Sequence, residues 1–158
     1  MKAIYPGSFD PVHNGHLDLI IRASDLFEHL TVAVYEEENQ NVLFSSSERV
    51  NLISESIPSD KKNVEVVAFS GLAVEFAKSL GAKFILRGLR AGFDFELEFE
   101  MALMWRSLDQ DVDVLCMMSS LQYQFVYSSR IKEVVRLDGD ISGLVPANVY
   151  TALKEKFS

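Results

Sequence analysis

The sequence predicts a single α/β domain built around a parallel five-stranded sheet. Short apolar segments alternate with amphipathic segments along the whole chain, and parallel neighbouring strands require a crossover, usually a helix, between them. The 158 residues, 48% of them hydrophobic and 24% charged, have the length and composition of one globular domain. No repeat, low-complexity tract or linker divides the sequence, so we expect residues 1–158 to fold as one unit.

The expected strands are short segments rich in Val, Ile, Leu and Phe, a composition typical of strands that are buried on both faces. They are residues 2–5, 30–35, 64–68, 83–87 and 113–118. Helices on both faces of such a sheet make a Rossmann-like, doubly wound arrangement. Ligands of this arrangement gather at the carboxyl ends of the strands.

The expected helices follow from apolar spacings of three and four residues and from capping signals. Residues 15–28 carry an apolar face, and Ser45 or Ser46 followed by Glu48 indicates the start of a second helix. The remaining helices are expected at residues 72–80, 93–108 and 128–137, and from the turn-rich stretch 140–146 to about residue 156.

The segment at residues 93–108 carries two conflicting signals. Its apolar residues alternate with polar ones as in a strand, but it has no β-branched residue and is rich in Glu, Leu, Met and Ala, so we expect a helix. Such a wide apolar surface needs a subunit partner as well as the core, which predicts an oligomer. Met104 and Trp105 are expected in the core or in that interface.

Composition also bears on partners and location. A net charge of -8 argues against binding to a nucleic-acid backbone, and the apolar runs fall short of the roughly 18–20 residues that cross a bilayer. Pro6 and Gly7 interrupt the first apolar segment before it resembles a secretory signal. Cys116 lies in an apolar run and is expected to be buried and inert. We therefore expect a cytoplasmic protein without nucleic-acid or membrane partners.

The segment from Gly7 to His16 is the first candidate site, because it joins the first strand to the following helix. Gly7 and Gly15 allow a close approach of the backbone to a ligand, and the helix N-terminus suits an anion. The imidazoles of His13 and His16 can donate to phosphate oxygens. A helix cap and a half-built zinc site are the alternatives; the only other histidine is the remote His29, so no metal-ligand set is expected.

Two further segments follow the fourth and fifth strands and reach the same edge of the sheet. Arg87-Gly88-Leu89-Arg90 offers two guanidinium groups that match phosphate, or is a solvated loop. Ser128 and Ser129 can cap the next helix, bind phosphate or do both, and Tyr123 can stack on a base. With no Ser-His-acid set, catalytic cysteine or P-loop motif, these groups indicate a phosphoryl-type transfer that relies on positioning and charge stabilisation.

Together these motifs resemble those of bacterial phosphopantetheine adenylyltransferases. Residues 5–16 contain the H-x-G-H signature of the nucleotidyltransferase superfamily, and residues 87–91, 94–96, 128–129 and 132–134 extend the resemblance over nearly the whole chain. It implies transfer of adenylate from ATP to 4'-phosphopantetheine, which gives dephospho-coenzyme A and pyrophosphate. It also implies Mg²⁺ as the cofactor and a homohexamer. For the reaction itself we expect direct in-line attack without a covalent intermediate.

The resemblance implies roles for individual residues. Ser8 would orient the attacking phosphate and contact ATP, His16 would stabilise charge on the α-phosphate, and Arg90 would be the third catalytic residue. Arg87 would hold the phosphate of phosphopantetheine, and Ala73 would touch its pantetheine arm. The rest of the ATP site would consist of Phe9, Gly88, Leu89, Glu98, Tyr123, Gln124, Phe125, Val126, Tyr127, Ser128 and Ser129.

The chain departs from the family pattern at several positions. Ser8 and His13 stand where Thr is usual or common, and Tyr127 replaces a frequent Ser. The family carries a phosphate-binding lysine in the loop after the second strand, where this chain reads Asn39-Gln40-Asn41, so Arg87 must suffice or another group must substitute. A relative with another nucleotide substrate and a noncatalytic nucleotide-binding module are the alternative functions. A tRNA-charging enzyme is excluded, because the chain is short and acidic.

Overall fold

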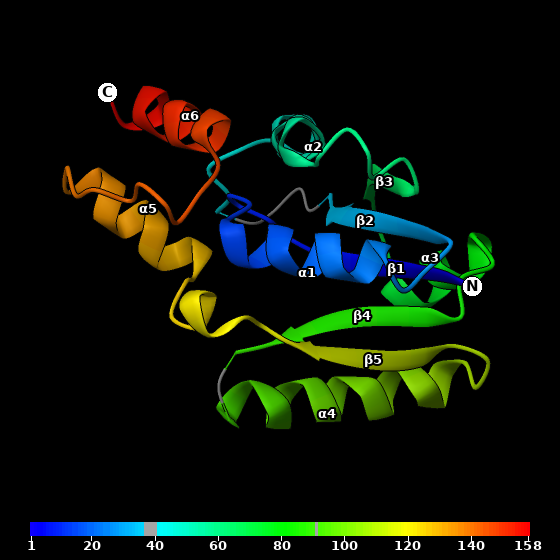
Figure 1. Ribbon diagram of the computed structural model, residues 1–158. Helices are drawn as coiled ribbons and strands as arrows, with labels where there is room; N and C mark the ends of the chain where they lie inside the picture. Colours follow the sequence, from blue (N-terminus) through cyan, green and yellow to red (C-terminus); the bar gives the residue numbers. More distant parts are fainter. Residues whose placement is uncertain (37–40, 91) are drawn as a thin grey trace.

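The computed structural model describes residues 1–36, 41–90 and 92–158. Its five strands are β1 (Lys2–Gly7), β2 (His29–Tyr35), β3 (Val64–Phe69), β4 (Phe84–Leu89) and β5 (Asp113–Met118). They pair in parallel in the order β3-β2-β1-β4-β5 (Figure 1). The chain thus builds outward from β1 to β3, returns, and builds outward again from β4 to β5. This confirms the doubly wound sheet, with the reversal between β1 and β4.

The helices lie on both faces of the sheet and beyond its carboxyl edge. They are α1 (Asn14–Ser24), α2 (Ser46–Ser56), α3 (Ala73–Ser79), α4 (Gly92–Leu108), α5 (Ser128–Arg136) and α6 (Ala147–Phe157), with a 3-10 turn, η1 (Leu121–Tyr123). The helices α1 and α2 cover one face, and α3 and α4 cover the other. The pair α5 and α6 packs beyond the strand ends (Figure 1).

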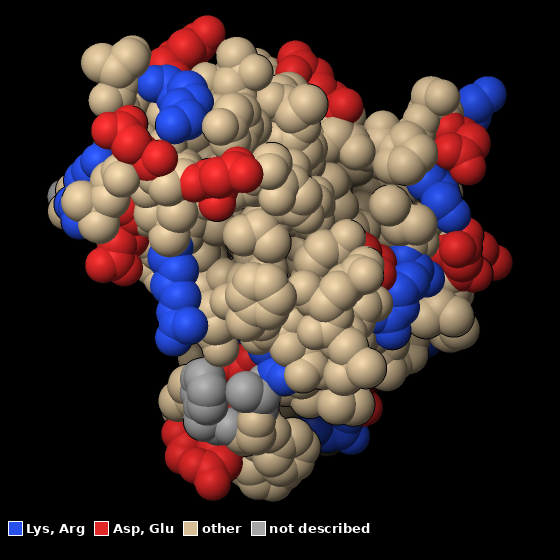
Figure 2. Space-filling view, turned by 60° about the vertical axis from the view of Figure 1, so that its left-hand side comes forward, with Lys and Arg blue, Asp and Glu red and all other residues tan. Residues whose placement is uncertain are grey.

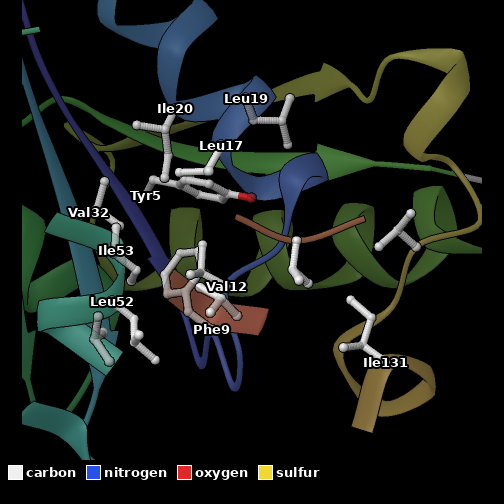
Figure 3. Packing of buried hydrophobic residues seen from close by; sticks show 14 of the residues in the cluster. Tyr5, Phe9, Val12, Leu17, Leu19, Ile20, Val32, Leu52, Ile53 and Ile131 are labelled. Carbon is white, nitrogen blue, oxygen red and sulfur yellow. The ribbon is translucent and has the colours of Figure 1, made fainter. Parts of the chain in front are cut away.

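The core forms two apolar layers because side chains alternate across the sheet. Tyr5 of β1 points toward α1, where it packs in one cluster with Leu19 and Ile20 (Figure 3). Ile4 points the other way, into a cluster with Val74 of α3 and Trp105 of α4. The start of α2 follows its sequence signal, since Ser45 and Glu48 form a reciprocal capping box. In contrast, α1 ends at Ser24, short of the predicted residue 28.

The segment at residues 93–108, whose pattern gave both strand and helix signals, is the helix α4, as expected. Much of its apolar surface is exposed in the single chain. Trp105 is 7% exposed and belongs to the core, whereas Met104 on the same helix is 59% exposed. The other exposed apolar residues of α4 are Phe95, Leu97, Phe99, Met101, Leu103 and Leu108. The single chain therefore leaves an apolar surface of α4 without a covering element. Figure 2 shows another view of the surface, on which Lys, Arg, Asp and Glu side chains surround a broad area that contains none of them.

The prediction of a buried cysteine is wrong. Cys116 is exposed, because β5 is the edge strand and Trp105 of α4 covers it only near Val114. Met118, two residues further along the same face, is also exposed. Within the described ranges, no helix is both long enough and apolar enough to span a membrane.

Candidate active site

A cavity of about 360 Å³ opens where the carboxyl ends of β1 and β4 diverge. This is the position at which doubly wound sheets bind ligands, because the chain leaves neighbouring strands in opposite directions. The segment from Gly7 to His16 lies along the cavity, and Arg87 of β4 and Arg90, the residue after β4, also line it. Ser128 at the start of α5 lies on the same wall, so two helix N-termini meet there.

The two histidines of the loop lock each other through a reciprocal cap at the start of α1. The backbone N–H of His16 donates to Nδ1 of His13, and the backbone N–H of His13 donates to Nδ1 of His16, both at 3.3 Å. Their rings stack with centroids 3.6 Å apart. Because both Nδ1 atoms accept, a neutral ring of either residue carries its hydrogen on Nε2. Capping therefore uses Nδ1 of each imidazole and does not occupy its Nε2.

Burial keeps both rings neutral. It lowers the pKa of His13 to about 3, and the nearby charge of Arg90 acts in the same direction. Burial, the neighbouring imidazole of His13 and the charges of Arg90 and Arg87 also lower the pKa of His16 well below its ordinary value. His13 Nε2 is buried and has no hydrogen-bond partner among the described residues. A buried N–H that lacks a partner is costly, so it marks a place where a ligand acceptor is expected.

Close packing explains the residue types around this pair. A Cβ on Gly15 would lie 3.0 Å from the ring of His13 and 3.3 Å from Cβ of Tyr123, so a larger residue here would push against the ring that sits over the helix start. Phe9 adopts a φ of 48°, which is strained for a residue with a side chain, and its ring meets His16 edge-on at 4.9 Å. Strained backbone of this kind concentrates at functional sites.

Arg87 is held rigidly on the opposite wall. Its Nε and Nη2 donate to the two carboxylate oxygens of Glu98 at 2.6 and 2.7 Å, and Nη1 donates to the Pro6 carbonyl at 3.1 Å. Although burial opposes its charge, these bonds to Glu98 raise the pKa of Arg87. The guanidinium is thus a fixed, permanently charged group at the cavity.

The predicted end of the fourth strand at Arg87 is too early, because β4 continues through Gly88 and Leu89 and pairs there with β5, and only Arg90 lies beyond it. Gly88 is therefore part of a strand. A Cβ at this position would lie 2.5 Å from Cδ1 of Leu19 on α1, so glycine serves helix packing rather than loop flexibility.

Arg90 is positioned by three groups. Its Nε donates to Asp94 at 3.1 Å, Nη1 donates to the Val126 carbonyl at 3.4 Å, and the guanidinium carbon lies 4.0 Å from the ring centre of Tyr127. Arg130 lies 4.8 Å from the same ring centre. Tyr127, the departure from the family pattern, is therefore an aromatic support for Arg90.

Comparison of the sequence with known proteins shows the family to which the chain belongs. The family model described as cytidylyltransferase-like matches residues 4–134. The phosphopantetheine adenylyltransferase of Thermomicrobium roseum is 50% identical over 99% of this chain and 95% of its own. The proteins of that name from Dehalococcoides mccartyi and Alkaliphilus oremlandii are 49% and 51% identical, over 100% and 98% of this chain and 99% and 98% of theirs. The chain belongs to the phosphopantetheine adenylyltransferase family. The resemblance indicated by the motifs is confirmed.

The chain brings all three predicted catalytic residues, Ser8, His16 and Arg90, to one cavity, but not the whole predicted ATP set. Ser8, Phe9, His16, Arg87, Gly88, Arg90, Glu98, Tyr123 and Ser128 line the cavity. Those outside its lining are Ala73, Leu89, Gln124, Phe125, Val126, Tyr127 and Ser129. Asn39 and Gln40, which stand where the resemblance implies a lysine, lie outside the described residues.

Of the roles left open for Ser128 and Ser129, a side-chain cap of α5 is excluded. The N-cap is Tyr127, without a side-chain cap bond, and Ser128 Oγ donates instead to the Pro11 carbonyl at 2.9 Å. The first N–H groups of any helix lack intrahelical partners. The first N–H groups of α5 therefore stay available beside the cavity. Ser128 ties the helix to the segment from Gly7 to His16.

Two buried residues that build the loop were not predicted from the sequence. Arg49, 2% exposed, donates to the carbonyls of Ser8 at 2.7 Å, Tyr35 at 3.0 Å and Phe44 at 3.0 Å, and so ties the loop to β2 and α2. Asp10 accepts the N–H groups of Leu43 and Phe44. An Asp beside Pro11 in a glycine-rich loop was the one available signal; Arg49 looked like an ordinary helix surface residue.

Proposed function

We propose that this chain transfers adenylate from ATP to 4'-phosphopantetheine, giving dephospho-coenzyme A and pyrophosphate. The observation that carries the proposal is the pair of neutral imidazoles, in which Nε2 of His13 is buried without a hydrogen-bond partner among the described residues, beside two arginines and two helix N-termini. Such a site offers many donors to phosphate without a nucleophile of its own. Membership of the family supplies the two substrates.

In the proposed reaction, an oxygen of the acceptor phosphate attacks the α-phosphorus of ATP in line. The new P–O bond forms as the bond to the bridging oxygen breaks, and pyrophosphate leaves with that oxygen. His16 donates from Nε2 to an α-phosphate oxygen, while Ser8 and Arg87 orient the acceptor. Orientation of two bound reactants is worth about 7–11 kcal/mol, and charge stabilisation by fixed donors supplies the rest.

The proposal includes Mg²⁺ that enters with the triphosphate. This ion usually keeps several waters and binds through substrate phosphates and one or two carboxylates. Asp10 and Glu98 are the carboxylates on the described cavity wall, and no cluster of three His, Cys, Asp or Glu side chains in the described residues would hold a metal alone. These residues fit a substrate-borne ion, which would supply positive charge to the departing pyrophosphate.

We also propose a homohexamer that works in the cytoplasm, where ATP is abundant. The exposed apolar surface of α4 supports self-association, since patches of this kind usually mark protein interfaces. Phe99→Glu should reduce the mass measured by light scattering, because it places a charge in that surface. Leu26→Glu, an exposed leucine outside α4, is the matched control and should leave the mass unchanged. A wild-type monomer would refute the assembly.

The reaction is tested directly by incubating the protein with ATP, Mg²⁺ and 4'-phosphopantetheine and measuring pyrophosphate. We expect release that requires both substrates. Release with nicotinamide mononucleotide or with CTP in place of the proposed substrates would favour another member of the superfamily. ATP binding without pyrophosphate release under any of these conditions would indicate a noncatalytic module.

A further inference from the structure

Tyr5 carries a buried hydroxyl group at the point where β1 and β4 separate. The pairing of these two strands ends at Ile4 with Ile85, although β1 stays paired with β2 as far as Gly7. Tyr5 is therefore the first residue of β1 beyond its pairing with β4, and it lines the cavity that opens there. The proposed reaction has given this residue no role.

The hydroxyl of Tyr5 has no hydrogen-bond partner among the residues that the structure describes. Tyr5 is 5% exposed, and its ring packs in an apolar cluster with Leu19 and Ile20 of α1, whose side chains offer no acceptor (Figure 3). In the described ranges, Nε2 of His13 is the one side-chain nitrogen or oxygen that is fully enclosed without a partner. The oxygen of Tyr5 is therefore not enclosed, and the small exposed part of this residue opens on the cavity.

A hydroxyl in this position weakens the folded chain unless a ligand bonds to it. Buried polar groups that lack a partner are costly, and phenylalanine would fill the same space without that cost. Burial also raises the pKa of Tyr5 to about 12, although the nearby charges of Arg87 and Arg90 act in the opposite direction. The phenol therefore keeps its hydrogen at neutral pH and can donate it to an acceptor on a ligand.

Packing fixes the position of this donor. The ring of Tyr5 meets Phe9 edge-on at a centroid distance of 5.3 Å, and Phe9 in turn meets the ring of His16 at 4.9 Å. The hydroxyl oxygen of Tyr5 lies 3.7 Å from the place that a Cβ on Gly88 would occupy, and Cδ1 of Leu19 lies 2.5 Å from the same place. The hydroxyl therefore reaches from β1 to the strand residue of β4 that has no side chain.

The lining residues next to the Tyr5 oxygen are uncharged. Leu19 and Gly88 are its neighbours in the cavity lining, and Tyr123 packs against the start of α1. Ser119 follows β5 on the other side of β4, is 7% exposed, lines the cavity and also has a hydroxyl without a partner among the described residues. Apolar surface with a few placed hydroxyls suits the uncharged nucleoside part of a nucleotide, whereas the histidines, arginines and helix N-termini suit its phosphates.

We propose that Tyr5 is a further substrate-binding residue, whose hydroxyl donates a hydrogen bond to the nucleoside part of ATP. This inference rests on the proposed reaction at the same site. The bond holds the nucleoside beside Gly88 while the triphosphate extends toward the N-termini of α1 and α5. A neutral hydrogen bond of this kind changes binding by about two- to tenfold.

Steady-state kinetics of Tyr5→Phe test the proposal, because this change removes the hydroxyl and keeps the ring contacts with Phe9 and α1. The KM for ATP should rise about fivefold, while kcat and the KM for phosphopantetheine should change less than about twofold. Tyr150→Phe is the matched control, because Tyr150 lies on α6 near Lys154, outside the cavity lining, and should change none of these values. An unchanged KM for ATP, or a rise confined to phosphopantetheine, would overturn the proposal.

The melting temperature separates a binding role from a structural one. Because the hydroxyl has no partner among the described residues, Tyr5→Phe should melt without ligand at the wild-type temperature or above it. Saturating ATP should stabilise the variant less than it stabilises the wild type. A variant that melts lower than the wild type without ligand, yet gains as much from ATP, would show that the hydroxyl serves the fold, and the proposal would be wrong.

Calorimetric titration needs no turnover and tests which part of the nucleotide is bound. Wild type and Tyr5→Phe are titrated with ATP and with inorganic tripolyphosphate, which lacks the nucleoside. The variant should bind ATP about fivefold more weakly and tripolyphosphate equally well. An equal loss for both ligands would place the hydroxyl against a phosphate and refute the inference. Pyrophosphate release by the wild-type chain reports separately on the proposed reaction, so the two failures are distinguishable.

Discussion

The two histidines on α1 and the two arginines from β4 face one cavity but are held by opposite means. The histidines depend on contacts within four residues of chain, stack on each other and are kept neutral by burial. The arginines stay charged, and each is paired with a carboxylate of α4, Glu98 or Asp94. One wall is therefore built by local geometry and the other by charge pairing across the fold.

The two arrangements limit the free-energy cost of gathering polar groups around one cavity in different ways. Neutral Nε2 donors need no counter-charge, whereas a cluster of unpaired guanidinium groups would repel each other. Glu98 and Asp94 balance that charge. Because both carboxylates lie on α4, whose other side is exposed and apolar, the charged wall is also the one closest to any subunit that packs there.

The largest effect on activity is expected from a change in the histidine pair. His16→Ala removes a fixed donor, so kcat should fall about 10²- to 10³-fold, while the circular dichroism spectrum stays native. His29→Ala is the control, because this exposed histidine pairs with Glu65 away from the cavity. Near-normal turnover in His16→Ala would contradict the assigned role of the imidazole.

The neutrality of the same wall predicts a pH dependence of stability. His13 has a pKa of about 3 when folded and an ordinary value of 6.5, so below about pH 6.5 the unfolded chain binds a proton that the folded chain does not. The free energy of unfolding should therefore fall as the pH drops from 6.5 toward 3. Between pH 7 and pH 5 this one group contributes about 2 kcal/mol.

Urea unfolding of wild type and His13→Asn at both pH values measures this contribution. The variant should lose less stability on acidification than the wild type, by about 2 kcal/mol. The comparison between the two proteins removes the contribution of carboxylates, which titrate in both. Identical pH dependence of the two proteins would mean that folding does not lower the pKa of His13. The ring would then be protonated in the folded chain at pH 5, and the histidine pair would not be neutral.

The histidine side of the cavity could be predicted from the sequence, and the arginine side could be predicted only in part. Capping, glycine spacing and strand-helix alternation act over a few residues, so the loop, its two histidines and the start of α2 at Ser45 were all found. The partners of the arginines on α4 depend on where a helix packs. Glu98 entered the prediction through resemblance, without its ion pair to Arg87.

The failures share a tertiary cause. Gly88 looked like a loop residue, but pairing with β5 extends the strand and Leu19 occupies the space of a Cβ. Ser128 looked like a cap, but Pro11, distant in sequence, takes its hydroxyl. Cys116 looked buried because its neighbours are apolar, although its strand lies at the sheet edge. None of these contacts leaves a periodic trace in the sequence.

The smallest effect is expected from a change that preserves the positive charge on the arginine side of the cavity. Arg87→Lys keeps one positive charge but cannot form the two parallel bonds to Glu98 or present a planar group to phosphate. The KM for the phosphopantetheine acceptor should rise about tenfold, equivalent to about 1.4 kcal/mol, with a smaller change in the KM for ATP. Arg106→Lys, in an exposed pair with Asp113, controls for the substitution itself and should change neither value. An Arg87→Lys enzyme with unchanged KM values would show that charge alone suffices at this position, and that the rigid pairing with Glu98 serves the fold instead of the acceptor.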